Sequence, residues 1–304
     1  MNKESEDAAP VGAKTSELRV PTYRGEFVRI IRVFCGRRIA LVGLIIIATL
    51  ILTSIFAPWV APYDPYQIDF SHKLLQPSCQ HLLGTDPLGR DTFSRIIFGS
   101  RISLMVGLGA VGIAAVIGGC LGLVAGYFGG VVSTIVMRLV DALMAIPMLL
   151  IALVVASVLG GGSKNVILAL GIAMISVVCR MMVGQVLSVK EKEFVLAGRA
   201  TGMSHWRMIA FHILPNTAPP LLVVITIGLG TAILSEAVLS FLGLGILPPE
   251  AAWGSMISDG YKYLMTNPIL SFAPGMAIML TVFGFNMMGD GLRDALDPTL
   301  RGVI

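Results

Sequence analysis

The sequence has few charged side chains, and their scarcity argues against a soluble fold. Only 13% of the 304 residues are Asp, Glu, Lys or Arg, whereas about 25% is usual in a soluble domain. Hydrophobic residues make up 55% of the chain, and the mean hydropathy is +0.84. A soluble fold could not bury so much apolar surface, so we expect an all-α polytopic membrane protein.

Cysteine and histidine are scarce too, with four of each. The cysteines, Cys35, Cys79, Cys120 and Cys179, follow no metal-ligand spacing and imply no disulfide framework. No group of His, Cys, Asp and Glu has the spacing of a metal site, and no set of Ser, His and Asp can be argued. The sequence therefore supports neither a metal site nor an enzyme.

A nucleotide-binding loop is missing as well. The segment from Gly12 to Thr15 contains a Lys-Thr pair, but it lacks a glycine directly before the lysine, the upstream glycine and a preceding strand. We therefore expect no cofactor on this chain, and any ATP and Mg²⁺ must be bound by another one. The net charge of +4 does not indicate nucleic acid, because the basic residues flank apolar stretches, where they set membrane topology.

Six apolar stretches are each long enough to cross a hydrocarbon core, which takes about 20 helical residues. We expect them at about residues 39–60, 102–127, 131–159, 166–189, 219–246 and 271–288, with a kink at Pro147. Residues 1–38 would form a cytoplasmic tail with an amphipathic helix, 61–101 an external loop, 102–290 the transmembrane core with a cytoplasmic loop at 190–216, and 291–304 a cytoplasmic tail. Most of the 22 Lys and Arg residues then lie in the cytoplasmic segments, in agreement with the positive-inside rule.

The polar loop at 190–216 interrupts the apolar second half of the chain. Its sequence predicts two short helices, the first ending near Ala200. Gly202 permits a bend, and Ser204 is a suitable N-cap for the second helix. Pro215 should end that helix, because a proline ring cannot continue the hydrogen-bond ladder.

Within this loop the chain reads Leu196-Ala197-Gly198, three residues, Gly202, nine residues, then His212-Ile213-Leu214-Pro215. The pattern resembles the motif Glu-Ala-Ala, three residues, Gly, nine residues, Ile-x-Leu-Pro of permease subunits in binding-protein-dependent ABC importers. There the loop is the coupling helix, which docks into a cleft on an ATPase subunit. The resemblance implies that role for Glu193, Ala197, Gly198, Gly202, His212, Leu214 and Pro215. Leu196 replaces the motif's acid and His212 its isoleucine, and Glu193, one turn earlier, is the candidate substitute for the acid. An amphipathic helix on the membrane surface is the alternative interpretation.

Other stretches narrow the resemblance to the dipeptide/oligopeptide/nickel branch of that family. They are the run GTDPLGRDTFSRIIFGSRIS at 84–103, SEAVLSFLGLG at 235–245, Pro248-Pro249 followed by Trp253-Gly254, and GDGLRDALDP at 289–298. The resemblance implies the MetI-like permease fold with six transmembrane helices. Charged side chains in the first run are candidates for contacts with the binding protein or the partner permease, namely Asp86, Arg90, Asp91 and Arg95. A self-contained, salt-bridged loop is the alternative.

Two ionisable residues, Arg180 and Glu236, fall inside the predicted spans that flank the polar loop. A charge at bilayer depth is costly unless it is paired or hydrated, so these residues are candidates for a polar translocation path or for a contact with the partner subunit. Mutual pairing is the alternative, or for Arg180 an extension to the interface. On the third span, Arg138 and Asp141 lie on one helical face and can pair.

The resemblance implies a C-type permease subunit of an ABC importer in the cytoplasmic (inner) membrane of a bacterium or archaeon, with both termini cytoplasmic. The implied partners are a second permease, two ATPase subunits and an external substrate-binding protein. Peptides are the expected substrate, with nickel, glutathione or another small solute as alternatives. An autonomous secondary transporter is the main rival, but the chain shows no convincing repeat between its halves and few intramembrane acids. A membrane scaffold or enzyme would leave the polar loop unexplained.

Overall fold

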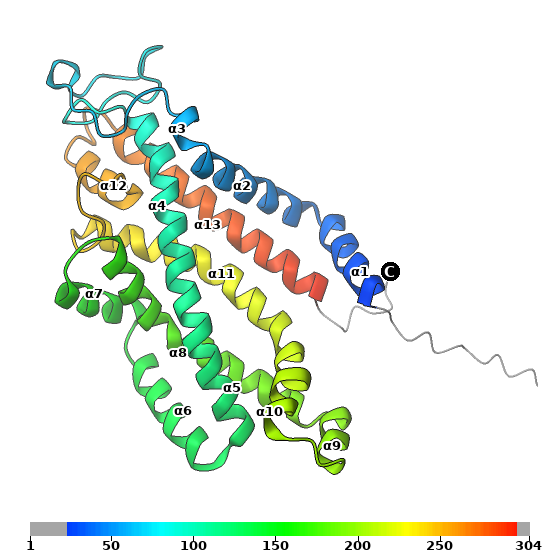
Figure 1. Cartoon of the computed structure of the whole chain (residues 1–304). Coiled ribbons are helices and arrows are strands. Elements are labelled where there is room, and N and C mark those ends of the chain that lie inside the picture. Colours follow the sequence, from blue (N-terminus) through cyan, green and yellow to red (C-terminus); the bar gives the residue numbers. More distant parts are fainter. Residues whose placement is uncertain (1–22, 297–304) are drawn as a thin grey trace, which may run out of the picture.

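The computed structural model describes residues 23–296, and in this part the regular structure is entirely helical (Figure 1). Five helical runs are long and apolar enough to cross a membrane: α2 (Arg38–Ile55), Thr92–Phe128, α8 (Ser163–Lys190), His205–Phe241 and α13 (Ile269–Leu296). A sixth crossing results if the bent pair of α6 (Gly130–Met144) and α7 (Met148–Leu159) counts as one span. The predicted all-helical membrane architecture is confirmed.

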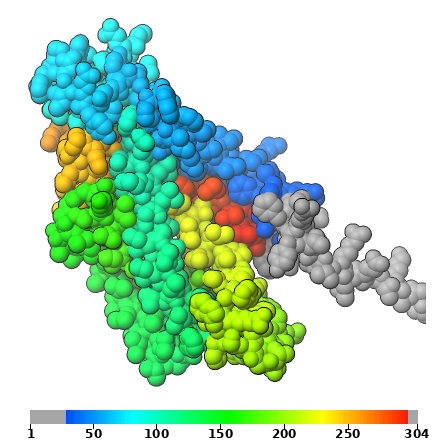
Figure 2. All heavy atoms as spheres, in the orientation of Figure 1, coloured from blue at the N-terminus to red at the C-terminus, as the bar shows by residue number. Residues whose placement is uncertain are grey.

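Shorter helices flank these spans. Helix α1 (Tyr23–Gly36) precedes α2, in the segment predicted to be an amphipathic helix, α3 (Ala57–Val60) follows α2, and the 3₁₀ turn η1 (Phe70–His72) lies in the first long loop. Helices α9 (Glu193–Ala200) and α10 (His205–Met208) follow α8, and α12 (Trp253–Tyr261) lies between α11 (Leu214–Phe241) and α13. The long loop after α3 and the α9 segment lie at opposite ends of the molecule (Figures 1 and 2).

The second span begins well before the predicted start at Ile102. Helix α4 (Thr92–Ile113) has Asp91 as its N-cap, and the Ser94 N–H donates to Asp91 Oδ2 at 2.8 Å, which satisfies one of the free amides at the helix start. The helix continues through a π-helical turn, η2 (Ala114–Gly118), into α5 (Gly119–Phe128). The last part of the predicted external loop 61–101 is therefore helical.

Glycines let the second span and α8 approach each other closely. A Cβ added at Gly118 would lie 2.6 Å from the Ile175 carbonyl oxygen, and one at Gly122 would lie 2.5 Å from that of Cys179. No side chain fits between these backbones. Small residues have this function in membrane helices, where packing rather than hydrophobicity drives association.

Helix α8 lies at the centre of the bundle and is the most buried of the five long runs, whereas α2 is the least buried. The main core joins α4, α8, α11 and α12 through buried side chains such as Val106, Leu170, Ile233 and Trp253. On α2, by contrast, Ile39 and Ile45 are each more than 60% exposed. The outer face of α2 is therefore available for lipid or for another chain.

The third span is broken rather than kinked. Helices α6 and α7 meet at an angle of 87°, and Pro147 occupies the N-cap of α7 in an extended conformation, with φ −52° and ψ 131°. Proline supplies no N–H to the preceding turn and disfavours helical geometry at the residue before it. The predicted kink at Pro147 is therefore a complete interruption of the helix.

Candidate functional site

Helix α9, the first helix of the predicted coupling loop, ends in a Schellman turn. The Met203 N–H donates to the Gly198 carbonyl oxygen at 3.1 Å and the Gly202 N–H to that of Arg199 at 3.0 Å. Gly202 has φ +76°, the left-handed conformation that this motif places directly after a helix. The predicted bend at Gly202 is confirmed.

The inner side of the loop packs against the helix ends beside it. Val195, Met208 and Ile213 are fully buried in a small core that also contains Val186 of α8. A Cβ at Gly198 would lie 2.7 Å from Met208 Cε, so this position leaves room for the methionine between α9 and α10. The loop is thus a folded unit seated on the bundle.

Tyr127, at the end of α5, ties this unit to the second span. Its hydroxyl group lies 2.7 Å from His205 Nδ1, and its carbonyl oxygen accepts a hydrogen bond from Lys190 Nζ at 2.9 Å. The Arg199 guanidinium lies over its ring, 5.9 Å from the centroid. From the sequence, Tyr127 was predicted only to end a span, because its partners are distant along the chain.

The outer side of the loop exposes large apolar side chains. Trp206 is 77% exposed and Phe211 70%, and Phe194 and Leu196 are also exposed. Of the residues predicted to act in coupling, five lie on this accessible side, and they are Glu193, Ala197, Gly202, Leu214 and Pro215. His212 is half-buried and its ring lies 6.3 Å from that of Phe194, whereas Gly198 is buried. Exposed apolar surface of this kind marks an interaction site.

The second helix of the loop does not end at Pro215, and this prediction was wrong. The chain is helical without a break from His205 to Phe241, through the π-helical turn η3 (Ile209–Ile213). In that turn the Leu214 N–H bonds to the Ile209 carbonyl oxygen, five residues back, so the helix is widened directly before the proline. Pro219 and Pro220, predicted to open the fifth span, also lie inside α11.

Ser204 occupies the predicted N-cap position of α10 in an extended conformation, but its side chain makes no capping hydrogen bond. Only its carbonyl oxygen takes part, accepting from the Met208 N–H at 2.9 Å.

Arg180 and Glu236 do not pair with each other among the described residues. Arg180 on α8 forms an ion pair with Asp141 on α6, and both side chains are more than 40% exposed. Asp141 therefore bonds to Arg180 and not to Arg138, its expected partner.

Glu236 is fully buried. Its Oε1 accepts a hydrogen bond from Ser240 Oγ at 2.6 Å, and Ser240 Oγ accepts one from the Ile246 N–H at 3.0 Å. These contacts join α11 to the loop that follows it.

The four charged residues of the predicted external contact site are all buried, and each is bonded within the long loop and the start of α4. Arg90 Nε lies 2.6 Å from Asp86 Oδ2, and Arg95 Nε lies 3.7 Å from the same oxygen. Asp91 caps α4 and also pairs with His81 Nδ1 at 2.9 Å. The four side chains thus hold the long loop on the start of α4, the arrangement of the alternative interpretation.

Comparisons with known proteins agree with this architecture. Residues 118–302 match the family model described as binding-protein-dependent transport system inner membrane component. Residues 26–77 match the N-terminal TM domain of oligopeptide transport permease C.

Three relatives are similar over most of their length. The dipeptide transport system permease protein DppC of Alkalihalophilus pseudofirmus is 44% identical over 264 residues, 87% of each chain. The probable D,D-dipeptide transport system permease protein DdpC of Escherichia coli K12 is 42% identical, over 88% of this chain and 90% of the relative. The glutathione transport system permease protein GsiD of Shigella sonnei is 42% identical, over 95% and 94%. This chain belongs to the family of binding-protein-dependent transport system inner membrane components, the MetI-like permeases of ABC importers.

Proposed function

We propose that this chain is a permease subunit of a peptide importer, and that with a second permease it forms the path for di- or oligopeptides across the inner membrane. Relatives named for dipeptides, D,D-dipeptides and glutathione support a substrate built from amino acid units. Glutathione is the second candidate substrate, and nickel or another small solute is a weaker one. Selectivity in such an importer would come largely from the external binding protein.

The folded loop supports the proposal that an ATPase subunit, one of two in the complete importer, binds at this end of the molecule. Its exposed apolar side chains, led by Trp206 and Phe211, would be covered by a cleft on the ATPase. ATP and Mg²⁺ would then be bound by those partners and not by this chain. The loop would face the cytoplasm together with both termini, and the opposite end would face the binding protein.

Movement of the ATPases would reach the spans through three connections of the loop. A short turn at Lys192 joins α9 to α8. The hydrogen bond between His205 and Tyr127 connects the loop to α5, and the unbroken helix from His205 to Phe241 connects it to α11. Because the Schellman turn and the buried core hold the loop as one unit, its displacement would shift these spans together. Rigid-body movements of this kind produce alternating access.

Arg180 is the stronger candidate for a residue on the translocation path. Its pair with Asp141 is exposed on the molecule, whereas Glu236 has no exposed surface. The polar pair would line a hydrated path or contact the second permease, since either environment lowers the cost of charge at membrane depth.

The test is to purify the tagged chain from its native membrane in mild detergent and to identify the proteins that accompany it. The key variant is Phe211→Glu, which places a charge on the outer side of the loop, and the matched control is Phe70→Glu, at a similarly exposed phenylalanine of the long loop. We expect ATPase subunits with the wild type and the control, and at least about a tenfold loss with Phe211→Glu, because a charge buried in an apolar interface is strongly unfavourable. A transport-competent chain without any ATPase would instead establish a secondary transporter.

A further inference from the structure

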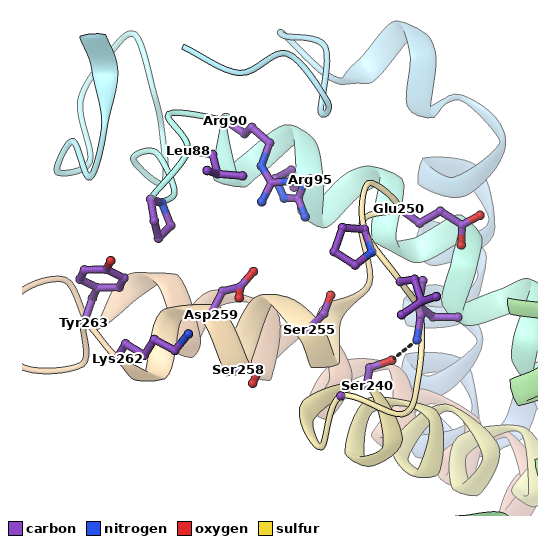
Figure 3. Close-up of a pocket in the computed structure, with 15 residues that line it drawn as sticks. Leu88, Arg90, Arg95, Ser240, Glu250, Ser255, Ser258, Asp259, Lys262 and Tyr263 are labelled. Atoms are coloured by element: carbon purple, nitrogen blue, oxygen red, sulfur yellow. Dashed lines mark hydrogen bonds between the residues drawn. The ribbon is translucent and has the colours of Figure 1, made fainter. Parts of the chain in front are cut away.

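A cavity of about 430 Å³ lies between the long loop, the end of α11 and α12 (Figure 3). Its volume is in the range of pockets that hold small molecules, about 300–1,000 Å³. Arg90 and Arg95 line one side, and Asp259 and Lys262 line the side formed by α12. The cavity is at the end of the molecule opposite the coupling loop.

The two arginines on the first side share a single carboxylate. Asp86 Oδ2 lies 2.6 Å from Arg90 Nε and 3.7 Å from Arg95 Nε, and both arginine residues are at least 94% buried. One further donor of Arg95 is used by the Pro65 carbonyl oxygen at 3.1 Å. Because each guanidinium carries five N–H donors and one carboxylate cannot neutralise two arginines, this side keeps positive charge and free donors for an anion.

The other lining charges have no ion-pair partner within residues 23–296. They are Glu250, Asp259 and Lys262. Figure 3 shows Asp259 pointing from α12 towards the side on which Arg95 lies. The cavity therefore offers free donors for a carboxylate on one side and the unpaired carboxylate of Asp259 for an ammonium group on the other (Figure 3).

We propose that this cavity is a subsite for small zwitterions with a free α-carboxylate and a free α-ammonium group, such as a dipeptide. The α-carboxylate binds on the side of Arg90 and Arg95, and the ammonium group binds to Asp259. Charge-assisted hydrogen bonds of this type are about twice as strong as neutral ones, so both ends of the ligand are recognised. The inference rests on the proposed peptide transport, because the subsite lies where a solute would be received before it crosses the membrane.

The test uses the complete importer in lipid nanodiscs without its external binding protein. Dialanine, N-acetyl-dialanine and dialanine amide are titrated by calorimetry. We expect saturable binding of dialanine, and about tenfold weaker binding of each capped form, because each cap removes one charged group. Asp259→Asn should weaken the binding of dialanine about tenfold and leave that of N-acetyl-dialanine unchanged. Asp290→Asn, at another exposed acid, on α13, should change neither.

Three results would overturn the subsite: no saturable binding, equal binding of the capped forms, or an unchanged affinity in Asp259→Asn. Binding that occurs only when the binding protein is added would overturn it too, since the cavity would then receive that protein instead. ATP-driven uptake by the same nanodisc complex, reconstituted in vesicles, reports separately on the proposed function. Normal uptake without direct dipeptide binding removes only the subsite, whereas absence of ATP-driven uptake removes the proposed function.

Discussion

At the scale of single residues, Gly202 sets the shape of the coupling loop through its backbone alone. Its φ is +76°, and a Cβ built there would have no atom within 4 Å. Gly202→Ala should therefore create no clash, but it should cost about 1–2 kcal/mol because L-residues disfavour the left-handed conformation. We expect a lower melting temperature and weaker stimulation of ATP hydrolysis by the binding protein, measured on the purified complex.

Two substitutions separate this effect from a general change in stability. Gly184→Ala, inside α8 and also without an atom within 4 Å of the added Cβ, should be neutral or stabilising, because alanine has a higher helix propensity than glycine. Gly202→Asn should retain more activity than Gly202→Ala, because asparagine tolerates the left-handed region better. Equal activities of the alanine and asparagine variants would show that the conformation at Gly202 is unimportant.

The bend at Gly202 could be predicted from the sequence because it depends on one residue and its immediate neighbours. The partners of Asp141 and Tyr127 could not. Arg138 was the obvious partner for Asp141 on one helix, but Arg180 reaches it from α8. Tyr127 contacts His205, which is 78 residues away in the sequence. Such contacts depend on how the helices pack against one another, and the spacing of residues along the chain carries no information about that packing.

At the scale of elements, a proline in the sequence marked the end of a helix at one position and not at another. Both Pro147 and Pro215 lack the N–H that a helix needs. At Pro147 the helix stops and the chain turns by 87°, whereas at Pro215 the preceding π-helical turn absorbs the defect and the helix continues. The sequence shows the missing donor, but it does not show whether a widened turn will accommodate it.

The ion pair between Arg180 and Asp141 is the polar link between α6 and α8. Reversing one charge, as in Arg180→Asp, should lower the melting temperature and the yield of the complex, because two like charges then face each other. The exchange of both residues, Arg180→Asp with Asp141→Arg, should restore at least half of the loss, since the opposite charges meet again. Thermal unfolding of the purified complex measures both effects.

The control for this double substitution exchanges the charges of Arg138 and Asp141, which are neighbours on α6. Arg138→Asp combined with Asp141→Arg keeps the net charge of α6 but leaves Arg180 facing an arginine. It should therefore be as unstable as the single reversal. Equal recovery by the two exchanges would assign the partner of Asp141 to Arg138 instead.

At the scale of the whole molecule, the two ends have different chemistry. One end has a loop with four buried charged residues, Asp86, Arg90, Asp91 and Arg95, and a cavity of mixed charge. The other end has a compact unit with exposed apolar side chains. The helical runs Thr92–Phe128 and His205–Phe241 extend between them without a break (Figure 1), so a change at one end can be passed to the other. The central burial of α8, which contacts spans from both halves of the chain, joins these ends into one body.

This arrangement makes a definite prediction about orientation, which the native cysteines can test. Cys35 on α1 and Cys79 in the long loop are both exposed, and the proposed topology places them on opposite sides of the membrane. Single-cysteine variants retaining one or the other should react differently with a membrane-impermeant maleimide. In intact cells only the Cys79 variant should be labelled, and after permeabilisation both should be, because Cys35 then becomes accessible.

A variant retaining Cys179, which is buried, is the control. It should stay unlabelled in both conditions, because labelling requires an exposed thiol. Labelling of Cys35 in intact cells would invert the topology, placing the coupling loop outside and removing any contact with an intracellular ATPase.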